Sequence, residues 1–190
     1  DMINVPRPIV ALAKEFPPGH LIPFHQHARA QLLYASSGVM TVKTISGIWV
    51  VPPLRAVWIP ALTDHQIKVS DQLSMRTLYI DPAFFPGPSE RCCVIAVTPL
   101  LKELILHAIA MPRLYLIKGP EERLLTVILD QIRSMRIAPL ELPIPKDVRL
   151  KKIYKRLSSC PADNRKLEDW GKMVGATGRT LARHFRLETG

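Results

Sequence analysis

The chain has 190 residues, of which 47% are hydrophobic and 22% charged, and its formal net charge is +10. This length allows one well-packed domain or two modest ones, and the composition is that of an ordinary globular protein. No run approaches the ~18 apolar residues of a membrane span, no signal-peptide pattern opens the chain, and the cysteines form no disulfide framework or zinc pattern, so we expect a cytoplasmic protein with no membrane partner.

Residues 1–98 are predicted to form a β-barrel. Residues 1–19 are rich in proline and are expected to form an edge strand or arm. Short β-prone runs separated by turn residues follow, and they cover 31–36, 39–45, 48–51, 56–59, 65–69, 73–80 and 92–97. Many short strands at this spacing are typical of an antiparallel barrel or sandwich, and nothing indicates a parallel sheet.

Three histidines are candidates for one site. Side chains two apart in an extended strand share a face, so His25 and His27 are predicted to point the same way. His65 begins an alternating segment whose apolar residues predict that it also turns inward. Three imidazoles, with Gln31 or water completing the shell, suit a divalent transition metal such as Zn, Ni or Fe. The alternative is that these side chains line a pocket for a small-molecule effector, with no metal.

The spacing of these residues resembles the first motif of the cupin family. The matching positions are Gly19, His25, His27, Gln31 and Gly38. Gln31 stands where the family has glutamate. Residues 47–65 resemble the second motif, but Leu62 replaces the usual turn glycine, which could displace His65. The resemblance covers about residues 15–80 and implies a small jelly roll whose mouth holds a metal or a small ligand.

Residues 99–137 change to a helical period. Thr98 and Pro99 predict a helix that ends near Met111, and Pro120 begins a second helix with an acidic first turn. The expected apolar stripes are Leu100, Leu101, Leu104, Ile105 and Ala108 in the first helix, and Leu124, Leu125, Ile128, Leu129 and Ile132 in the second. Such stripes either cover the barrel or pair with a second copy, so a homodimer is one interpretation.

A proline-rich stretch, residues 138–146, is predicted to be an extended linker between domains. Residues 146–190 carry 12 Lys or Arg against 5 Asp or Glu, whereas residues 1–145 carry 14 against 11. The basic excess therefore lies in the C-terminal unit, residues 147–190, as expected for a unit that binds a polyanion such as DNA. A solvated basic surface is the alternative.

Residues 147–190 are predicted to form three helices. Asp147 is a candidate N-cap for the first helix, Gly175 a left-handed stop for the second, and Thr177 a cap for the third, which covers residues 178–189. Two helices joined by a short turn with glycine form a helix-turn-helix arrangement. The candidate DNA-binding residues are Thr177, Arg179, Thr180, Ala182, Arg183 and Arg186.

The sequence of residues 167–190, LEDWGKMVGATGRTLARHFRLETG, closely resembles the first helix-turn-helix of AraC-type transcription regulators. The resemblance implies an effector-binding cupin barrel, dimerisation through the intervening helices, and C-terminal DNA binding. It also implies roles by position: Arg179, Ala182 and Arg183 face bases, Thr177 and Thr180 face phosphates, and Leu181 and Phe185 lie in the core. The family has two such units, so the expectation is either a chain truncated after the first unit or a protein that keeps only one.

We therefore predict a multidomain α+β protein with a cupin-like antiparallel barrel, a helical pair and a three-helix helix-turn-helix unit. Its predicted function is effector-responsive DNA binding, with no catalytic residues. The alternative is a metal-dependent cupin enzyme of oxygenase or isomerase type with a basic tail. That alternative lacks an acid/base pair, because Asp64 is the only carboxylate near the histidines in sequence.

Overall fold

The computed structural model describes residues 4–138, 141–143, 145–159 and 163–189. The chain forms two compact units, Asp1–Glu141 and Leu142–Gly190. Their boundary falls in the stretch 138–146, part of which lies outside the described residues. No helix in the described ranges is long and apolar enough to cross a membrane.

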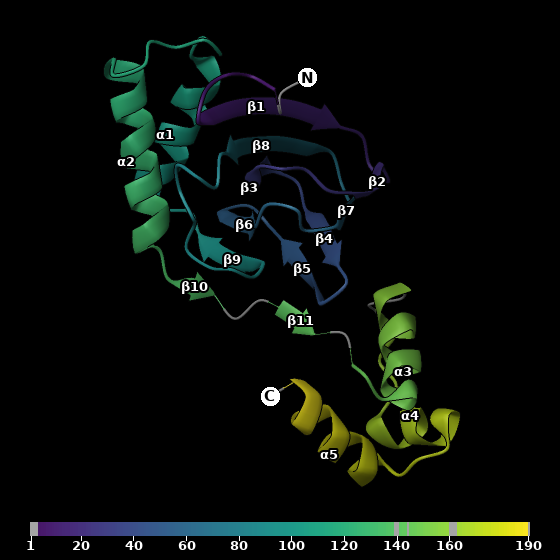
Figure 1. Cartoon of the computed structure of the whole chain (residues 1–190). Helices are drawn as coiled ribbons and strands as arrows, with labels where there is room; N and C mark the ends of the chain where they lie inside the picture. Colours follow the sequence, from purple (N-terminus) through teal and green to yellow (C-terminus); the bar gives the residue numbers. More distant parts are fainter. Residues whose placement is uncertain (1–3, 139–140, 144, 160–162, 190) are drawn as a thin grey trace. The chain divides into compact units, whose positions relative to one another are not determined.

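The first unit is built on two antiparallel sheets (Figure 1). The strands are β1 (Ile9–Phe16), β2 (Leu21–His25), β3 (Ala30–Ser37), β4 (Met40–Thr44), β5 (Gly47–Val51), β6 (Arg55–Ile59), β7 (His65–Val69), β8 (Leu73–Ile80), β9 (Cys93–Ala96) and β10 (Ile137–Ala138). A further short strand, β11 (Glu141–Pro143), lies at the boundary between the two units. Within the first unit, one sheet has the order β1-β8-β3-β6-β9-β10 and the other β5-β4-β7-β2. The predicted antiparallel barrel or sandwich is confirmed, and β1 is an edge strand as expected.

The six-stranded sheet is buried on both faces. Its inner face, with Leu33 and Val57, packs against the other sheet through residues such as Val42. Its outer face, with Leu32 and Trp58, belongs to a second hydrophobic cluster that includes the helices after β9. Every residue from Ala30 to Ala35 is therefore buried, and apart from Gln31 these residues are apolar on both faces rather than on alternate positions.

Helices α1 (Pro99–Ala110) and α2 (Pro120–Ser134) cover the outer face of the six-stranded sheet (Figure 1). The predicted N-cap is confirmed, because Thr98 Oγ1 accepts a hydrogen bond from Leu101 N at 3.2 Å. The buried helix residues are Leu101, Ile105, Ala108, Leu125, Ile128, Leu129 and Ile132. The predicted stripes therefore pack within the chain. Leu100 was wrongly placed in the first stripe, since it is 55% exposed.

The second unit contains α3 (Val148–Ser159), α4 (Leu167–Val174) and α5 (Gly178–Thr189). Its small core consists of Leu150, Trp170 and Leu181, with Ile153, Val174 and Ala176 packed around them. Asp147 caps α3, since its Oδ1 accepts from Arg149 N at 2.8 Å and from Leu150 N at 3.3 Å. Phe185, expected in the core, is 49% exposed, so that placement was wrong.

The turn between α4 and α5 depends on two glycines. Gly175 has φ +70° and ends α4 in the left-handed conformation, as predicted. A Cβ on Gly171 would lie 2.5 Å from Ala176 O, so the turn folds closely over α4. Thr177 Oγ1 then accepts from Thr180 N at 3.1 Å, which confirms the predicted cap of α5.

Candidate functional site

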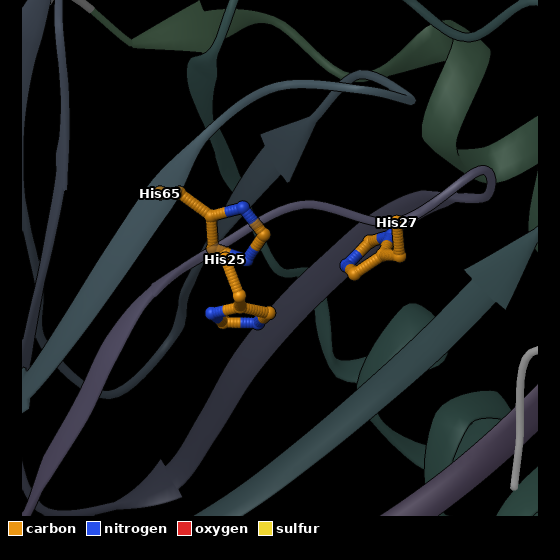
Figure 2. Close-up of side chains that lie close together, drawn as sticks. All are labelled: His25, His27 and His65. Carbon is orange, nitrogen blue, oxygen red and sulfur yellow. The ribbon is translucent and has the colours of Figure 1, made fainter.

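His25, His27 and His65 come together in the barrel. Each has a ring nitrogen that lies within 4.8 Å of the others. The ring centroids are 4.3 Å apart for His25 and His65 and 5.3 Å for His27 and His65. Figure 2 shows the His25 and His65 rings next to each other, with the His27 ring to one side. His65 is fully buried and His27 is 7% exposed, whereas His25 is partly open to solvent.

The backbone brings them together by strand pairing and a loop contact. His25 is the last residue of β2 and pairs with His65, the first residue of β7. His27 lies beyond the end of β2, so the expectation of one strand carrying both histidines was wrong. Its backbone is held instead by the loop before β7, because Leu62 N donates to His27 O at 2.9 Å.

Each ring is oriented by a backbone carbonyl. In every case Nδ1 faces a carbonyl oxygen: His25 and Pro23 O at 2.9 Å, His27 and Arg29 O at 2.5 Å, and His65 and Thr63 O at 2.8 Å. A protonated Nδ1 donates this bond and leaves the lone pair on Nε2. This is the tautomer that binds a metal through Nε2, with the orienting contact usual for metal-ligating histidines.

His65 Nε2 is a buried atom without a hydrogen-bond partner among the described residues. Burial lowers the pKa of His65 to about 4, so its imidazole is neutral at neutral pH. A buried polar atom without a partner costs free energy. A cation bound to Nε2 would remove that cost, so the donor set fits a metal ion.

The side-chain amide oxygen of Gln31 points toward the histidine cluster. Thr77 donates its hydroxyl proton to Leu32 O at 3.2 Å and therefore accepts from Gln31 Nε2 at 2.9 Å. This fixes the amide so that Oε1 lies 3.2 Å from His27 Nε2. When His27 donates through Nδ1, two acceptors face each other here, and a cation bound to both atoms would satisfy both.

Thr77 and Tyr79 are neighbours of the site that the sequence reasoning did not single out. The Tyr79 ring meets the His27 ring edge-on at 5.2 Å, and burial raises the pKa of its hydroxyl. In the pairing of β3 with β8, Gln31 is opposite Tyr79. The alternating pattern of residues 73–80 could have identified both residues, because Thr77 and Tyr79 share the face that carries buried Met75.

Leu62 occupies the turn position where the motif has glycine, and the turn still forms. It adopts φ +59°, a left-handed conformation that costs a residue with a Cβ about 1–2 kcal/mol. The side chain is 68% exposed, so little packing offsets this cost. His65 nevertheless reaches the cluster, and the expected displacement does not occur.

Leu62→Gly is expected to raise the free energy of unfolding by about 0.5–1 kcal/mol, because glycine adopts this φ without a steric penalty but gains entropy when unfolded. Urea denaturation followed by circular dichroism measures the change. Leu62→Ala is the matched control, since it also shortens the side chain but keeps the Cβ. An equal gain in both variants would show that strain at this φ is not the cause.

The candidate DNA-binding residues lie together on α5 and its cap. Arg179, Ala182, Arg183 and Arg186 are exposed, and with Thr180 and Leu187 they line a groove of about 640 Å³. The hydroxyls of Thr177 and Thr180 lie 2.9 Å apart. The face is basic and open, as the sequence indicated, while its contact with DNA stays a prediction.

A second cluster of potential ligands, Asp147, His184 and Glu188, has another explanation. Glu188 accepts hydrogen bonds from the backbone N–H groups of Lys146 and Asp147. Arg149 pairs with Asp147 at 2.6 Å, and this hydrogen bond holds the pKa of the Asp147 carboxyl well below its usual value. Both carboxylates therefore already have partners. Glu188 links the end of α5 to the start of α3, and Asp147 pairs with Arg149.

Comparison with known proteins gives three relevant findings. Residues 9–109, more than half of the chain, match the AraC-like ligand binding domain family. The HTH-type transcriptional regulator NimR of Escherichia coli K12 is 29% identical over 168 residues, which are 88% of this chain and 61% of NimR. The chain therefore spans less than two thirds of that relative's length.

Among solved structures, ToxT from Vibrio cholerae aligns over 95% of this chain and 76% of its own, with a TM-score of 0.51 and 6% identity. Its K231A variant aligns over 96% of this chain with a TM-score of 0.50. At such low identity these likenesses concern the fold alone. A cupin superfamily protein from Desulfitobacterium hafniense aligns over only 38% of this chain, with a TM-score of 0.35.

Proposed function

The chain belongs to the family with an AraC-like ligand-binding domain, and we propose that it is a DNA-binding transcription regulator whose jelly-roll unit binds a small effector or a metal ion. The observation that carries this proposal is the open basic face of α5, in a chain that also holds the buried histidine cluster. The identity with an HTH-type regulator, NimR, supports it.

We assign the DNA-binding role to the α4–α5 pair. A tight turn with a left-handed glycine followed by a capped helix is the arrangement of a helix-turn-helix, and its second helix enters the major groove. Arg179, Ala182 and Arg183 would then face bases. Thr177 and Thr180 would face phosphates, with Arg186 adding charge at the next turn.

We assign the effector role to the histidine cluster with Gln31. Three neutral imidazole nitrogens and one amide oxygen suit Zn, Ni or Fe(II). An organic effector bound by the same side chains is the second candidate. The barrel interior favours a small occupant, because the inward residues Val42, Ile59 and Ile67 are at most 2% exposed.

We do not assign an enzymatic role. The relative that the chain matches along most of its length is a regulator, and Asp64, the carboxylate nearest the histidines in sequence, is exposed. A metal-dependent cupin enzyme would need an acid/base group beside an open metal position.

We propose that the chain forms a homodimer through the free side of α1 and α2. Leu100 is 55% and Val127 44% exposed, and a groove of about 420 Å³ runs along Leu104, Leu106 and Leu124. An effector would act by shifting populations: ligand in the barrel biases how the units pack and so changes the spacing of two DNA-binding units.

Fluorescence anisotropy tests the function, with duplexes selected from a random-sequence library. We expect selected duplexes to bind more tightly than scrambled ones, with log affinity falling linearly against log salt at a slope of roughly −3 to −6, since several phosphates are neutralised. Added effector or metal should change the affinity. No selection of any duplex, and no binding at low salt, would contradict the regulator proposal.

A further inference from the structure

We propose that the histidine site, once loaded with a divalent metal, takes up a small carboxylate anion as an additional ligand. The inference rests on the metal site proposed above and adds the chemical class of a second effector. The effector bound by the barrel would then be a metal together with a carboxylate, rather than either alone.

The argument begins with charge. The first ligands are three imidazoles, which add no charge when they bind a metal through Nε2, and the fourth is the Gln31 amide, which is also uncharged. A divalent ion would therefore bring two uncompensated positive charges. Gln31 is 2% and His65 0% exposed, so solvent screens this charge poorly.

The described residues supply no carboxylate within the ligand cluster itself. Among the described residues, the cluster of potential ligand atoms around the site contains histidines only. The charge of Asp64 acts on the neighbouring His65, but this carboxylate is exposed, so solvent screens it, and it does not belong to the cluster of ligand atoms. Gln31 occupies the position where a glutamate would have supplied a negative charge. An anion from solution can supply that charge, and a carboxylate oxygen is a good ligand for the metals that imidazole also binds.

Access and space restrict the size of that anion. His25 is partly open to solvent, so a ligand can approach from its side. Along the strands, the next inward neighbours of His65 and Gln31 are Ile67 and Leu33, which are 2% and 0% exposed. The packed interior closes the site on that side. Acetate-sized anions fit this description better than sugar-sized molecules.

Cobalt(II) and acetate test the inference on the full chain. Co(II) in a mixed nitrogen and oxygen site absorbs visible light, and the spectrum changes when a ligand joins the shell. We expect acetate to change the spectrum of the Co(II)-loaded protein saturably, and calorimetry to show no acetate binding to the metal-free protein. Acetate binding of equal strength without metal would overturn the inference.

Gln31→Glu supplies the missing charge within the chain. It is expected to raise Co(II) affinity and lower acetate affinity, each by about tenfold or more, because the new carboxylate replaces the anion. Gln72→Glu is the matched control: it makes the same charge change in an exposed turn and should leave both affinities unchanged. Equal effects of the two variants would overturn the inference.

The remaining outcomes separate this inference from the metal site itself. Co(II) binding with no response to acetate would overturn the anion proposal and leave the metal site standing. Absence of Co(II) binding would overturn both, while DNA binding would still stand on its own measurement. If circular dichroism shows that Gln31→Glu does not fold, the inference is still tested by comparing acetate binding to the Co(II)-loaded and the metal-free wild-type protein.

Discussion

His65→Ala is expected to lower the affinity of the protein for Zn(II) or Ni(II) by at least about 100-fold. His65 is fully buried, its Nε2 has no partner among the described residues, and its ring is already oriented by Thr63 O. Removing a metal ligand should cost more than removing a residue that only orients one, which typically costs 10–100-fold. Competition with a chromophoric chelator measures the change.

Elemental analysis completes this test. Wild-type protein should retain about one metal ion per chain, and a variant with His25, His27 and His65 all replaced by alanine should retain none. His107→Ala is the control, because His107 is an exposed histidine on α1 outside the cluster. Loss of metal in His107→Ala, or its retention in the triple variant, would contradict the site and leave the pocket to an organic effector.

The histidine cluster could be predicted from sequence because period-two alternation places His65 inward with Ile67 and Val69. Gln31 could be predicted only through its spacing in the motif. Its role depends on Thr77, which lies 46 residues further along the chain and meets it across the pairing of β3 with β8. Strand pairing between distant segments sets such contacts, and the local sequence carries little information about it.

The failed placements have a common physical origin. Leu100 and Phe185 fall on the apolar side of a helical wheel, yet both are about half exposed. For Phe185, the second unit is too small to bury every apolar residue, and its core closes around Leu150, Trp170 and Leu181. For Leu100, the sheet covers only the part of the α1 stripe that contains Leu101, Ile105 and Ala108. Helical period predicts which face turns inward, but the neighbouring element decides how wide the buried stripe is.

The N-terminal caps were predictable for a complementary reason. Thr98, Asp147 and Thr177 act through hydrogen bonds to N–H groups two or three residues ahead, so all of the information is local. The left-handed stop at Gly175 is local in the same way. These short-range signals fix where α5 begins, and hence which of its side chains lie on the exposed face.

Arg183→Ala is expected to weaken binding to a selected duplex by about 1–3 kcal/mol, or roughly 5- to 150-fold. Arg183 is exposed on the face of α5 opposite Leu181, which anchors the helix in the core at 2% exposure. An arginine in this position can donate two hydrogen bonds to one guanine edge. Anisotropy titrations at fixed salt measure the loss, and Arg123→Ala, an exposed arginine on α2, controls for the change in charge.

The way in which Arg183→Ala weakens DNA binding distinguishes two roles for Arg183. If it reads a base, Arg183→Ala relaxes sequence preference at one position of the duplex and leaves scrambled DNA bound about as before. If it contacts a phosphate, all sequences weaken together and the slope of log affinity against log salt falls by about one unit. Unchanged affinity for every duplex would contradict the proposed contact of Arg183 with DNA and count against α5 as the recognition helix.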